Sequence, residues 1–238
     1  MSATSDNLMM GPGKDGELPI RIAPSLLACD FANIESQVRL VEDGGADWLH
    51  LDVMDGHFVP NISFGQPVIE SIAKVARKPL DTHIMIDHPI QYAESFAKAG
   101  ADILTFHIEA PDDAGEAIRV IREHGMKVGL TVNPGTDVKD IAPYLDQTDM
   151  ILVMSVWPGF GGQKFIPDVL DKIRALRGEY GYTRDIEIDG GIGPDTIAEA
   201  AAAGANVFVA GSAIYGAPDP VERIRELRAE AAAAFARS

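Results

Sequence analysis

Histidine and aspartate alternate with aliphatic residues in one short stretch, His50-Leu51-Asp52-Val53-Met54. Successive side chains of an extended strand point to opposite faces, so His50, Asp52 and Met54 would share one face. A buried carboxylate without a partner is costly, and a cation or a proton must compensate its charge. Imidazole nitrogens and carboxylate oxygens both suit a divalent transition metal. We therefore interpret His50 and Asp52 as two metal ligands on one strand.

Two other predicted strands carry matching groups. His83 and Met85 share a face of residues 79–86, and Asp189 ends residues 186–190 on the same face as Glu187. The sequence thus predicts a site for one divalent ion (Zn, Fe, Mn or Co), with the ligands His50, Asp52, His83 and Asp189. A single histidine in a strand is more often packed or exposed than a ligand. That interpretation is kept for His57, His88, His107 and His124, although His107 also lies at a strand end.

These residues can meet only if their strands belong to one sheet. Four stretches share a small or polar lead, then Asp or Asn, then an apolar run: 44–53, 99–108, 147–156 and 203–212. Further strand candidates lie midway between them, at 79–86, 127–133 and 186–190, and residues 20–28 precede them all. The pattern therefore predicts eight strands.

Amphipathic patterns fill the intervals between these strands. Apolar residues recur at three and four positions in 33–45, 67–77, 90–100, 113–125, 169–181, 196–204 and 222–236. Alternating strands and helices imply a parallel sheet, and eight units predict a single α/β domain, a (βα)₈ TIM barrel of the phosphate-binding type, over residues 20–238. An open doubly wound sheet is the alternative, but no GxGxxG follows the first strand.

Active sites of such barrels lie at the C-terminal ends of the strands, where glycine-rich segments are found in three successive units. These segments are WPGFGGQKF (157–165), DGGIGPDT (189–196) and GSAIYG (211–216). Glycine lets backbone N–H groups approach an anion, so the three segments predict that one end of the substrate is a phosphate. Other residues expected at strand ends are Ser25 and three methionines. Met54, Met85 and Met154 either fill the core or line the site and exclude water from an anionic intermediate.

Charge and cysteine content narrow the classes of partner. The net charge of −16 disfavours nucleic acid and anionic membrane surfaces, which bind through Lys and Arg. The single cysteine, Cys29, allows no intrachain disulfide, and no apolar run reaches the length of a membrane span. Residues 1–19 are polar, rich in Gly and Pro, and unlike a signal peptide. We interpret them as a flexible leader and expect a cytoplasmic protein.

Together the motifs resemble the ribulose-phosphate 3-epimerase family from Ile20 to Tyr215. The resemblance rests on APSLLACDFANI (23–34), HLDVMDGHFVPNISFG (50–65), THIMI followed by HP (82–89), MSVWPGFGGQKF (154–165), IDGGI (188–192) and AGSAIY (210–215). It implies a divalent metal on the four ligands named above, with Asp52 and Asp189 as the acid/base pair. The implied substrate contacts are Ser25, His83, Gly159, Phe160, Gly161, Gly162, Asp189, Gly190, Gly191, Gly211 and Ser212.

One residue departs from the family pattern. Trp157 precedes Pro158 where members more often carry a small or polar residue, which concerns the rim of the site or a subunit contact. The resemblance also implies an isomerase of carbohydrate metabolism, in the pentose phosphate pathway, assembled as a homo-oligomer (dimer or hexamer).

The implied reaction is the interconversion of D-ribulose 5-phosphate and D-xylulose 5-phosphate at C3. A carbon acid beside a ketone is far weaker than a carboxylic acid, so the enediolate must be stabilised, and a metal does this as a Lewis acid. Asp52 and Asp189 come from different strands and could flank the sugar, one as acid and one as base.

Three alternatives stay open. A 3-epimerase of a hexulose phosphate such as allulose 6-phosphate would use the same chemistry. Another phosphate-binding barrel, such as a decarboxylase or an indole-pathway enzyme, would share the glycine segments but not the four ligands. A non-catalytic phosphosugar-binding barrel would bind without turnover, and two intact aspartates disfavour it.

Overall fold

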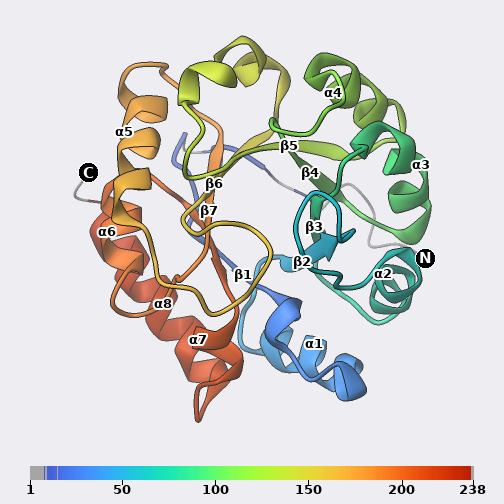
Figure 1. Ribbon diagram of the computed structural model, residues 1–238. Helices are drawn as coiled ribbons and strands as arrows, with labels where there is room; N and C mark the ends of the chain where they lie inside the picture. The colour runs from blue at the N-terminus through green and yellow to red at the C-terminus, as the bar shows by residue number, and fades with distance from the viewer. Residues whose placement is uncertain (1–7, 9, 15, 237–238) are drawn as a thin grey trace.

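The computed structural model describes residues 8, 10–14 and 16–236, and its strands form one parallel sheet that curls into a barrel (Figure 1). The strands are β1 (Arg21–Pro24), β2 (Leu49–Met54), β3 (Leu80–Met85), β4 (Ile103–His107), β5 (Lys127–Val132), β6 (Met150–Met154), β7 (Asp185–Asp189) and β8 (Val207–Ala210). Their order is β1-β8-β7-β6-β5-β4-β3-β2, and a parallel bridge between Ser25 and His50 brings β2 back to β1. The predicted (βα)₈ TIM barrel is confirmed, and the open sheet is wrong.

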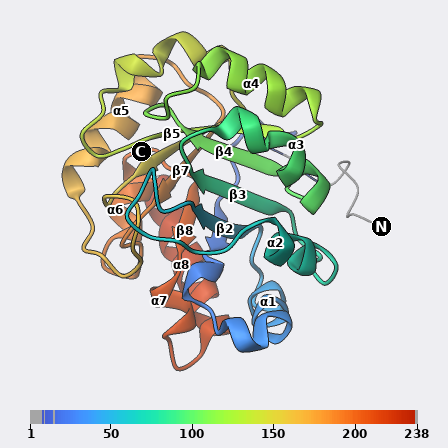
Figure 2. The same cartoon turned by 45° about the vertical axis from the view of Figure 1, so that its right-hand side comes forward.

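Helices surround the strands in Figure 1, and Figure 2 shows β2, β3 and β4 side by side with α2, α3 and α4 on their outer side. The helices are α1 (Ile34–Asp43), α2 (Gln66–Ala73), α3 (Pro89–Ala99), α4 (Ala114–Glu123), α5 (Leu170–Gly178), α6 (Ile197–Ala202), α7 (Ser212–Tyr215) and α8 (Pro220–Phe235). Seven of them fall within or overlap the amphipathic segments of the sequence. The short α7 follows β8. No helix in the described part of the chain is long and apolar enough to cross a bilayer.

The connection from β5 to β6 differs from the others. It contains two 3₁₀ segments, η4 (Val138–Asp140) and η5 (Ala142–Gln147), in place of an α-helix. Asp137 caps η4 through the N–H of Lys139, and Pro143 lies in the first turn of η5. A proline has no N–H to continue an α-helical ladder, which is compatible with this short, tight connection.

The two faces of each strand meet different surroundings. On β2, Leu49, Leu51 and Val53 belong to the main hydrophobic core together with residues of the surrounding helices. The intervening His50 and Asp52 are also buried, yet they belong to none of the apolar clusters. Alternation along the strand therefore directs aliphatic side chains to the helices and leaves polar side chains inside the barrel.

The Asp or Asn of the repeated sequence pattern has a structural role. Each one lies just before an even-numbered strand, and its side-chain oxygen accepts a hydrogen bond from a backbone N–H near the start of the preceding odd-numbered strand. The four bonds are Asp47–Ile22 (2.8 Å), Asp102–Leu80 (2.8 Å), Asp149–Val128 (2.9 Å) and Asn206–Ile186 (2.9 Å). In each pair the backbone N–H of the Asp or Asn also donates to the carbonyl of its partner residue. The repeat therefore joins neighbouring strands at their N-terminal ends.

Part of the predicted leader contacts this end of the barrel. Leu8 and Met10 pack against a buried cluster that includes Trp48 and Met150, and the N–H of Gly11 donates to Asp185 at 2.6 Å. Residues 1–7, 9 and 15 of the leader lie outside the described residues. The division into a flexible leader, 1–19, and a catalytic domain, 20–238, stays a prediction.

Candidate functional site

A cavity of about 340 Å³ opens at the C-terminal ends of the strands. It is lined by the expected strand-end residues and by all three glycine-rich segments. Its predicted members are Ser25, Asp52, Met54, Met85, Met154, Gly159, Phe160, Gly161, Gly162, Asp189, Gly190, Gly191, Gly211 and Ser212. Of the predicted site residues, only His50 and His83 do not line this cavity; both are fully buried.

The four predicted ligands converge at the cavity. Their ligand atoms all lie within 4.8 Å of one another. Asp52 Oδ1 is 3.3 Å from His50 Nε2 and 3.2 Å from His83 Nδ1, and Asp189 Oδ2 is 3.9 Å from each of these nitrogens. Ligands bonded at about 2.1 Å to one ion are separated by roughly 3.0–3.4 Å at octahedral or tetrahedral angles. The contacts of Asp52 already match this spacing, those of Asp189 are longer, and the set could hold a single divalent ion if its members moved closer together.

The surroundings of His50 support this fit. Its Nδ1 lies 2.6 Å from Asp81 Oδ2, whereas Nε2 is buried and has no hydrogen-bond partner among the described residues. Although burial opposes protonation, the charges of Asp52 and Asp81 raise the pKa of His50 well above its ordinary value. A cation would take the place of that proton on Nε2, while Nδ1–H donates to Asp81. The unpaired nitrogen is the observation that most directly indicates a ligand.

A second acidic group lies behind His50. His50, Asp81 and Glu187 could also hold a metal by their spacing, but Asp81 and Glu187 are fully buried and do not line the cavity. Burial and the charge of Asp81 raise the pKa of Glu187 well above its usual range, so we treat its carboxyl as neutral. Sequence reasoning missed Asp81, although its place two residues before His83 on β3 gives both the same face.

The two aspartates have opposite electrostatic surroundings. Burial raises the pKa of Asp52, but the charge of His50, whose Nε2 lies 3.3 Å from Oδ1, and the contact with His83 at 3.2 Å outweigh it and hold the pKa well below its usual range. The hydroxyl of Ser25 also donates to Asp52 Oδ2 at 2.6 Å. By contrast, no described residue donates a hydrogen bond to the side chain of Asp189, and burial and the charge of Asp52 raise its pKa to about 7. One carboxylate is stabilised as an anion, and the other is ready to hold a proton.

Packing explains some of the glycines but not all. Gly190 and Gly191 have positive φ angles of 122° and 66°. A Cβ at Gly190 would lie 2.5 Å from the side chain of Val156, and one at Gly191 would lie 2.7 Å from the backbone nitrogen of Phe165. At Gly161 a Cβ would meet nothing within 4 Å, and φ is not positive. The fold therefore requires glycine at 190 and 191, whereas Gly161 is free of that requirement.

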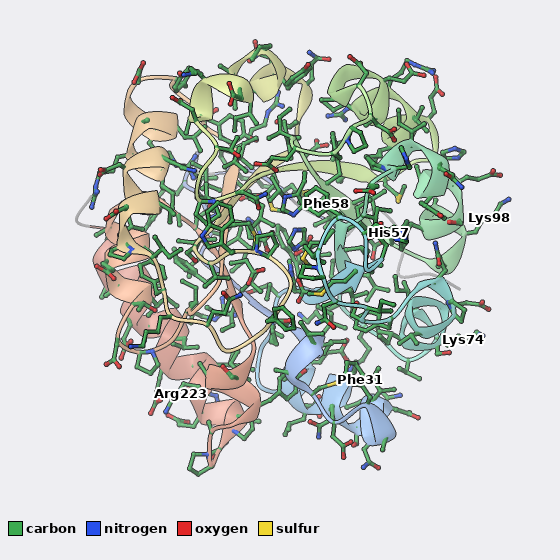
Figure 3. All side chains as sticks on the ribbon, in the orientation of Figure 1. Phe31, His57, Phe58, Lys74, Lys98 and Arg223 are labelled. Carbon is green, nitrogen blue, oxygen red and sulfur yellow. The ribbon has the colours of Figure 1, made fainter. Side chains whose placement is uncertain are left out.

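The loops after β2 and β6 meet above the strands, near the centre of Figure 1. The side chain of Asn61 donates to the carbonyl of Gly159 at 2.7 Å. Figure 3 labels His57 and Phe58 on the loop after β2, and the Phe58 ring lies 4.7 Å from that of His107. Trp157, beside the cavity-lining Pro158, is 56% exposed and covers Gly135 on the loop after β5. Trp157 thus belongs to the rim of the site.

Sequence reasoning also missed the residues behind His83. His107 was expected to be packed or exposed; it is buried, and its Nε2 lies 2.8 Å from His83 Nε2 while its Nδ1 lies 3.1 Å from Glu109. Burial and the charge of His83 lower the pKa of His107 to about 4, so the ring is neutral. Its place at the C-terminal end of β4 was the signal available in the sequence.

Comparisons with known proteins identify the family of this chain. The model described as the ribulose-phosphate 3 epimerase family matches residues 21–215. The cytoplasmic isoform of ribulose-phosphate 3-epimerase from Oryza sativa subsp. japonica is 50% identical over 212 residues, which cover 87% of this chain and 92% of the relative. Ribulose-phosphate 3-epimerase from Bacillus subtilis is 48% identical over 213 residues, 88% of this chain and 98% of the relative.

Solved structures at lower identity share the fold. A 3-hexulose-6-phosphate synthase from Salmonella typhimurium has a TM-score of 0.65 at 22% identity, covering 90% of this chain and 100% of its own. Orotidine 5′-phosphate decarboxylase from Pyrococcus horikoshii has a TM-score of 0.66 at 14% identity, covering 89% and 99%. These likenesses concern the barrel, whereas the family match and the two close relatives concern the sequence itself. On that evidence the chain belongs to the ribulose-phosphate 3-epimerase family.

Proposed function

We propose that this protein is a ribulose-phosphate 3-epimerase that interconverts D-ribulose 5-phosphate and D-xylulose 5-phosphate. The observation that carries the proposal is the pair Asp52 and Asp189, which reach one cavity from β2 and β7 with opposite pKa shifts. Two carboxyl groups whose surroundings separate their pKa values are suited to act as base and acid in one reaction. The names of the close relatives support the same activity.

Epimerisation at C3 removes a proton from one face of the carbon and returns one to the other face. Asp52, held as a carboxylate by Ser25 and the two imidazoles, takes the proton in one direction. Asp189, whose pKa is raised to about 7, delivers a proton from the opposite side. In the reverse direction the two residues exchange roles, because each ends the reaction in the protonation state that the other began with.

The remaining site residues bind and shield the substrate. His50, Asp52, His83 and Asp189 would hold one divalent ion (Zn, Fe, Mn or Co), which supplies Lewis-acid stabilisation of negative charge on the sugar oxygens. Met54, Met85 and Met154 give the cavity an apolar wall that excludes water. Backbone N–H groups of Gly190, Gly191, Gly211 and Ser212, with the 159–162 segment, are the proposed contacts of the phosphate.

The two-carboxyl mechanism has a specific test. D52N and D189N are assayed in D₂O with each epimer separately, following epimerisation and C3–H exchange by NMR. We expect each variant to lose epimerisation by about 10²–10⁴-fold. Any exchange that remains should occur on one epimer only, and on opposite epimers in the two variants. Metal content is measured alongside because both residues are proposed ligands.

D171N is the matched control for this test, since it makes the same Asp-to-Asn change at an exposed residue of α5. Near-normal epimerisation by either site variant would contradict the mechanism. D-allulose 6-phosphate is assayed in parallel, and a faster rate on that sugar would favour a hexulose-phosphate epimerase. Binding of both sugars without turnover would favour a non-catalytic barrel.

Two further expectations stay predictions. We propose that the protein is a homo-oligomer, a dimer or a hexamer, which light scattering of the purified chain would test. We also propose a cytoplasmic location, for which the rice relative named as the cytoplasmic isoform is the available support.

A further inference from the structure

Behind the proposed ligand His83 lies a hydrogen-bonded chain that the reaction itself does not use. His83 directs Nδ1 to the site, 3.2 Å from Asp52 Oδ1, and its other nitrogen lies 2.8 Å from Nε2 of His107. The centroids of the two imidazole rings are 5.0 Å apart, and the ring planes differ by 27°. The centroid distance exceeds the nitrogen–nitrogen distance by about the diameter of one ring. The two nitrogens therefore lie between the ring centres, where an N–H of one ring meets the lone pair of the other.

One proton lies between these nitrogens, and the next contact decides which ring carries it. Nδ1 of His107 lies 3.1 Å from Glu109 Oε2. The other oxygen of Glu109 accepts hydrogen bonds from the backbone N–H of Asn133, at 2.8 Å, and from the hydroxyl of Thr136. A carboxylate that accepts on one oxygen and faces a ring nitrogen with the other requires a proton on that nitrogen.

The direction of the whole chain follows from this acceptor. A neutral His107 carries its single proton on Nδ1, towards Glu109, so its Nε2 is an acceptor. With a cation bound between His83 Nδ1 and Asp52 Oδ1, which lie 3.2 Å apart, His83 then carries its proton on Nε2 and keeps the lone pair on Nδ1, the nitrogen that points into the site. The opposite arrangement would place an unprotonated His107 nitrogen against the Glu109 carboxylate, two acceptors facing each other.

The end of the chain is anchored to a helix. The ammonium group of Lys172, on α5, donates to the carbonyls of Asn133, Pro134 and Thr136 at 2.6, 2.9 and 2.5 Å. These bonds hold the loop after β5, which in turn holds Glu109. His107 is fully enclosed, with Phe58 packed on its ring. The chain is therefore a fixed element of the barrel wall.

We infer that His107 and Glu109 are positioning residues, which fix His83 in its Nε2–H form and aim its Nδ1 lone pair at a divalent cation. His50 has the complementary arrangement, in which Asp81 holds Nδ1–H directly and leaves Nε2 for the cation. The two imidazoles thus present opposite nitrogens to one site. A carboxylate supports each of them, Asp81 directly for His50 and Glu109 through His107 for His83. This inference depends on the cation of the proposed function, and it adds residues outside the cavity lining.

Cation affinity and imidazole tautomer test the inference without turnover. Zn²⁺ affinity is measured by chelator competition for the full chain and for H107L, H107Q, E109Q and the control H124L, which makes the same change at an exposed histidine. Loss of such a supporting group typically weakens metal binding ten- to hundredfold, and we expect this for H107L. H107Q retains an acceptor near the former Nε2 and should recover most of the affinity.

E109Q probes the direction of the chain. A glutamine has one acceptor and one donor end, whereas Glu109 meets donors at both ends. In either orientation of the glutamine amide, its NH₂ group faces another hydrogen-bond donor. We therefore expect weaker Zn²⁺ binding, although Gln and Glu side chains have nearly the same shape. Long-range ¹H–¹⁵N correlations of the Zn²⁺-loaded protein should give His83 as Nε2–H in the wild type, with altered shifts in E109Q.

The outcomes separate the two proposals. Wild-type Zn²⁺ affinity in both H107L and E109Q, or a His83 ring protonated on Nδ1 in the loaded protein, would overturn this inference alone. A wild-type protein that binds Zn²⁺ but does not epimerise ribulose 5-phosphate would contradict the proposed function. The ratios of Zn²⁺ affinity between the variants and the wild type would still test this inference. A wild-type chain that binds none of Zn²⁺, Fe²⁺, Mn²⁺ and Co²⁺ would overturn both.

Discussion

The two ends of β7 carry aspartates that differ in their hydrogen-bond partners. Asp185 begins the strand and Asp189 ends it, and both side chains lie on the same face. Asp185 accepts hydrogen bonds from Arg21 at 2.6 Å, from the side chain of Asn206 at 2.7 Å and from the N–H of Gly11 at 2.6 Å. Asp189 accepts none from the described residues, and burial beside Asp52 raises its pKa to about 7. Burial alone therefore does not mark a functional carboxylate; the missing partners do.

The same contrast holds for the two ends of the barrel. At the N-terminal ends, Asp47, Asp102, Asp149 and Asn206 each satisfy a backbone N–H of a neighbouring strand. At the C-terminal ends, the buried His50 Nε2 has no hydrogen-bond partner among the described residues, and the pKa of Asp189 is raised to about 7. One end uses polar groups to join strands, and the other leaves them available for a ligand.

The largest effect on turnover is expected from a change at the C-terminal ends of the strands. D189N removes the group that holds a proton, so turnover of ribulose 5-phosphate should fall by about 10²–10⁴-fold. The melting temperature of the cation-free protein should not fall, because the variant removes a partly buried charge that has no hydrogen-bond partner among the described residues. Stopped assays and calorimetry on one preparation measure both. A large loss of stability in D189N would contradict the division between the two ends.

The matching change at the other end should act on stability. In D185N an amide NH₂ replaces one carboxylate oxygen, although Arg21, Asn206 and Gly11 all donate to this side chain. Breaking a buried ion pair in this way costs about 3–5 kcal/mol of unfolding free energy. Urea unfolding measures that loss, while kcat per folded molecule should stay within about threefold of wild type. A catalytic loss without a stability loss would mean that the two ends are not separate.

The pH dependence of cation binding should provide a third distinction between the two ends of the barrel. Below its pKa of about 7, Asp189 holds a proton that competes with a bound cation for the carboxyl group. Affinity for Zn²⁺ or Mn²⁺ should therefore rise with pH by about tenfold per unit for each displaced proton, and the Asp189 contribution should level off above pH 7. Titrations between pH 5 and 8 with D189N as the reference isolate this contribution. An equal pH slope in wild type and D189N would exclude Asp189 as the titrating ligand.

The sequence was sufficient to predict the barrel and to bring the four candidate ligands together, because both depend on local periodicity. Strand alternation places His50 and Asp52 on one face, and the regular order of strands and helices brings His83 and Asp189 to the same end. The partners behind the ligands could not be assigned in this way. His50 meets Asp81 because β2 and β3 pair in a register that aligns these two residues, and no local pattern states that register.

The glycines give a similar lesson about what a sequence motif can state. Gly190 and Gly161 both belong to segments that predicted a phosphate site. Only the packed backbone distinguishes Gly190, where Val156 leaves no room for a side chain, from Gly161, which has open space around it. A glycine required by the fold and one available for a ligand therefore look alike in the sequence.

The smallest effect, and the finest test of the contrast, concerns these glycines. G161A adds a methyl group to open space at the cavity wall with an ordinary φ, so the unfolding free energy should change by less than about 0.5 kcal/mol. If the 159–162 backbone approaches the phosphate, the same methyl group should raise KM for ribulose 5-phosphate several-fold and leave kcat nearly unchanged, since it weakens ground-state and transition-state binding alike. G190A is the control: its Cβ would clash with Val156, so it should lower stability clearly. An unchanged KM in G161A would remove the 159–162 segment from the phosphate site and leave the Gly190–Gly191 and Gly211–Ser212 segments to form it.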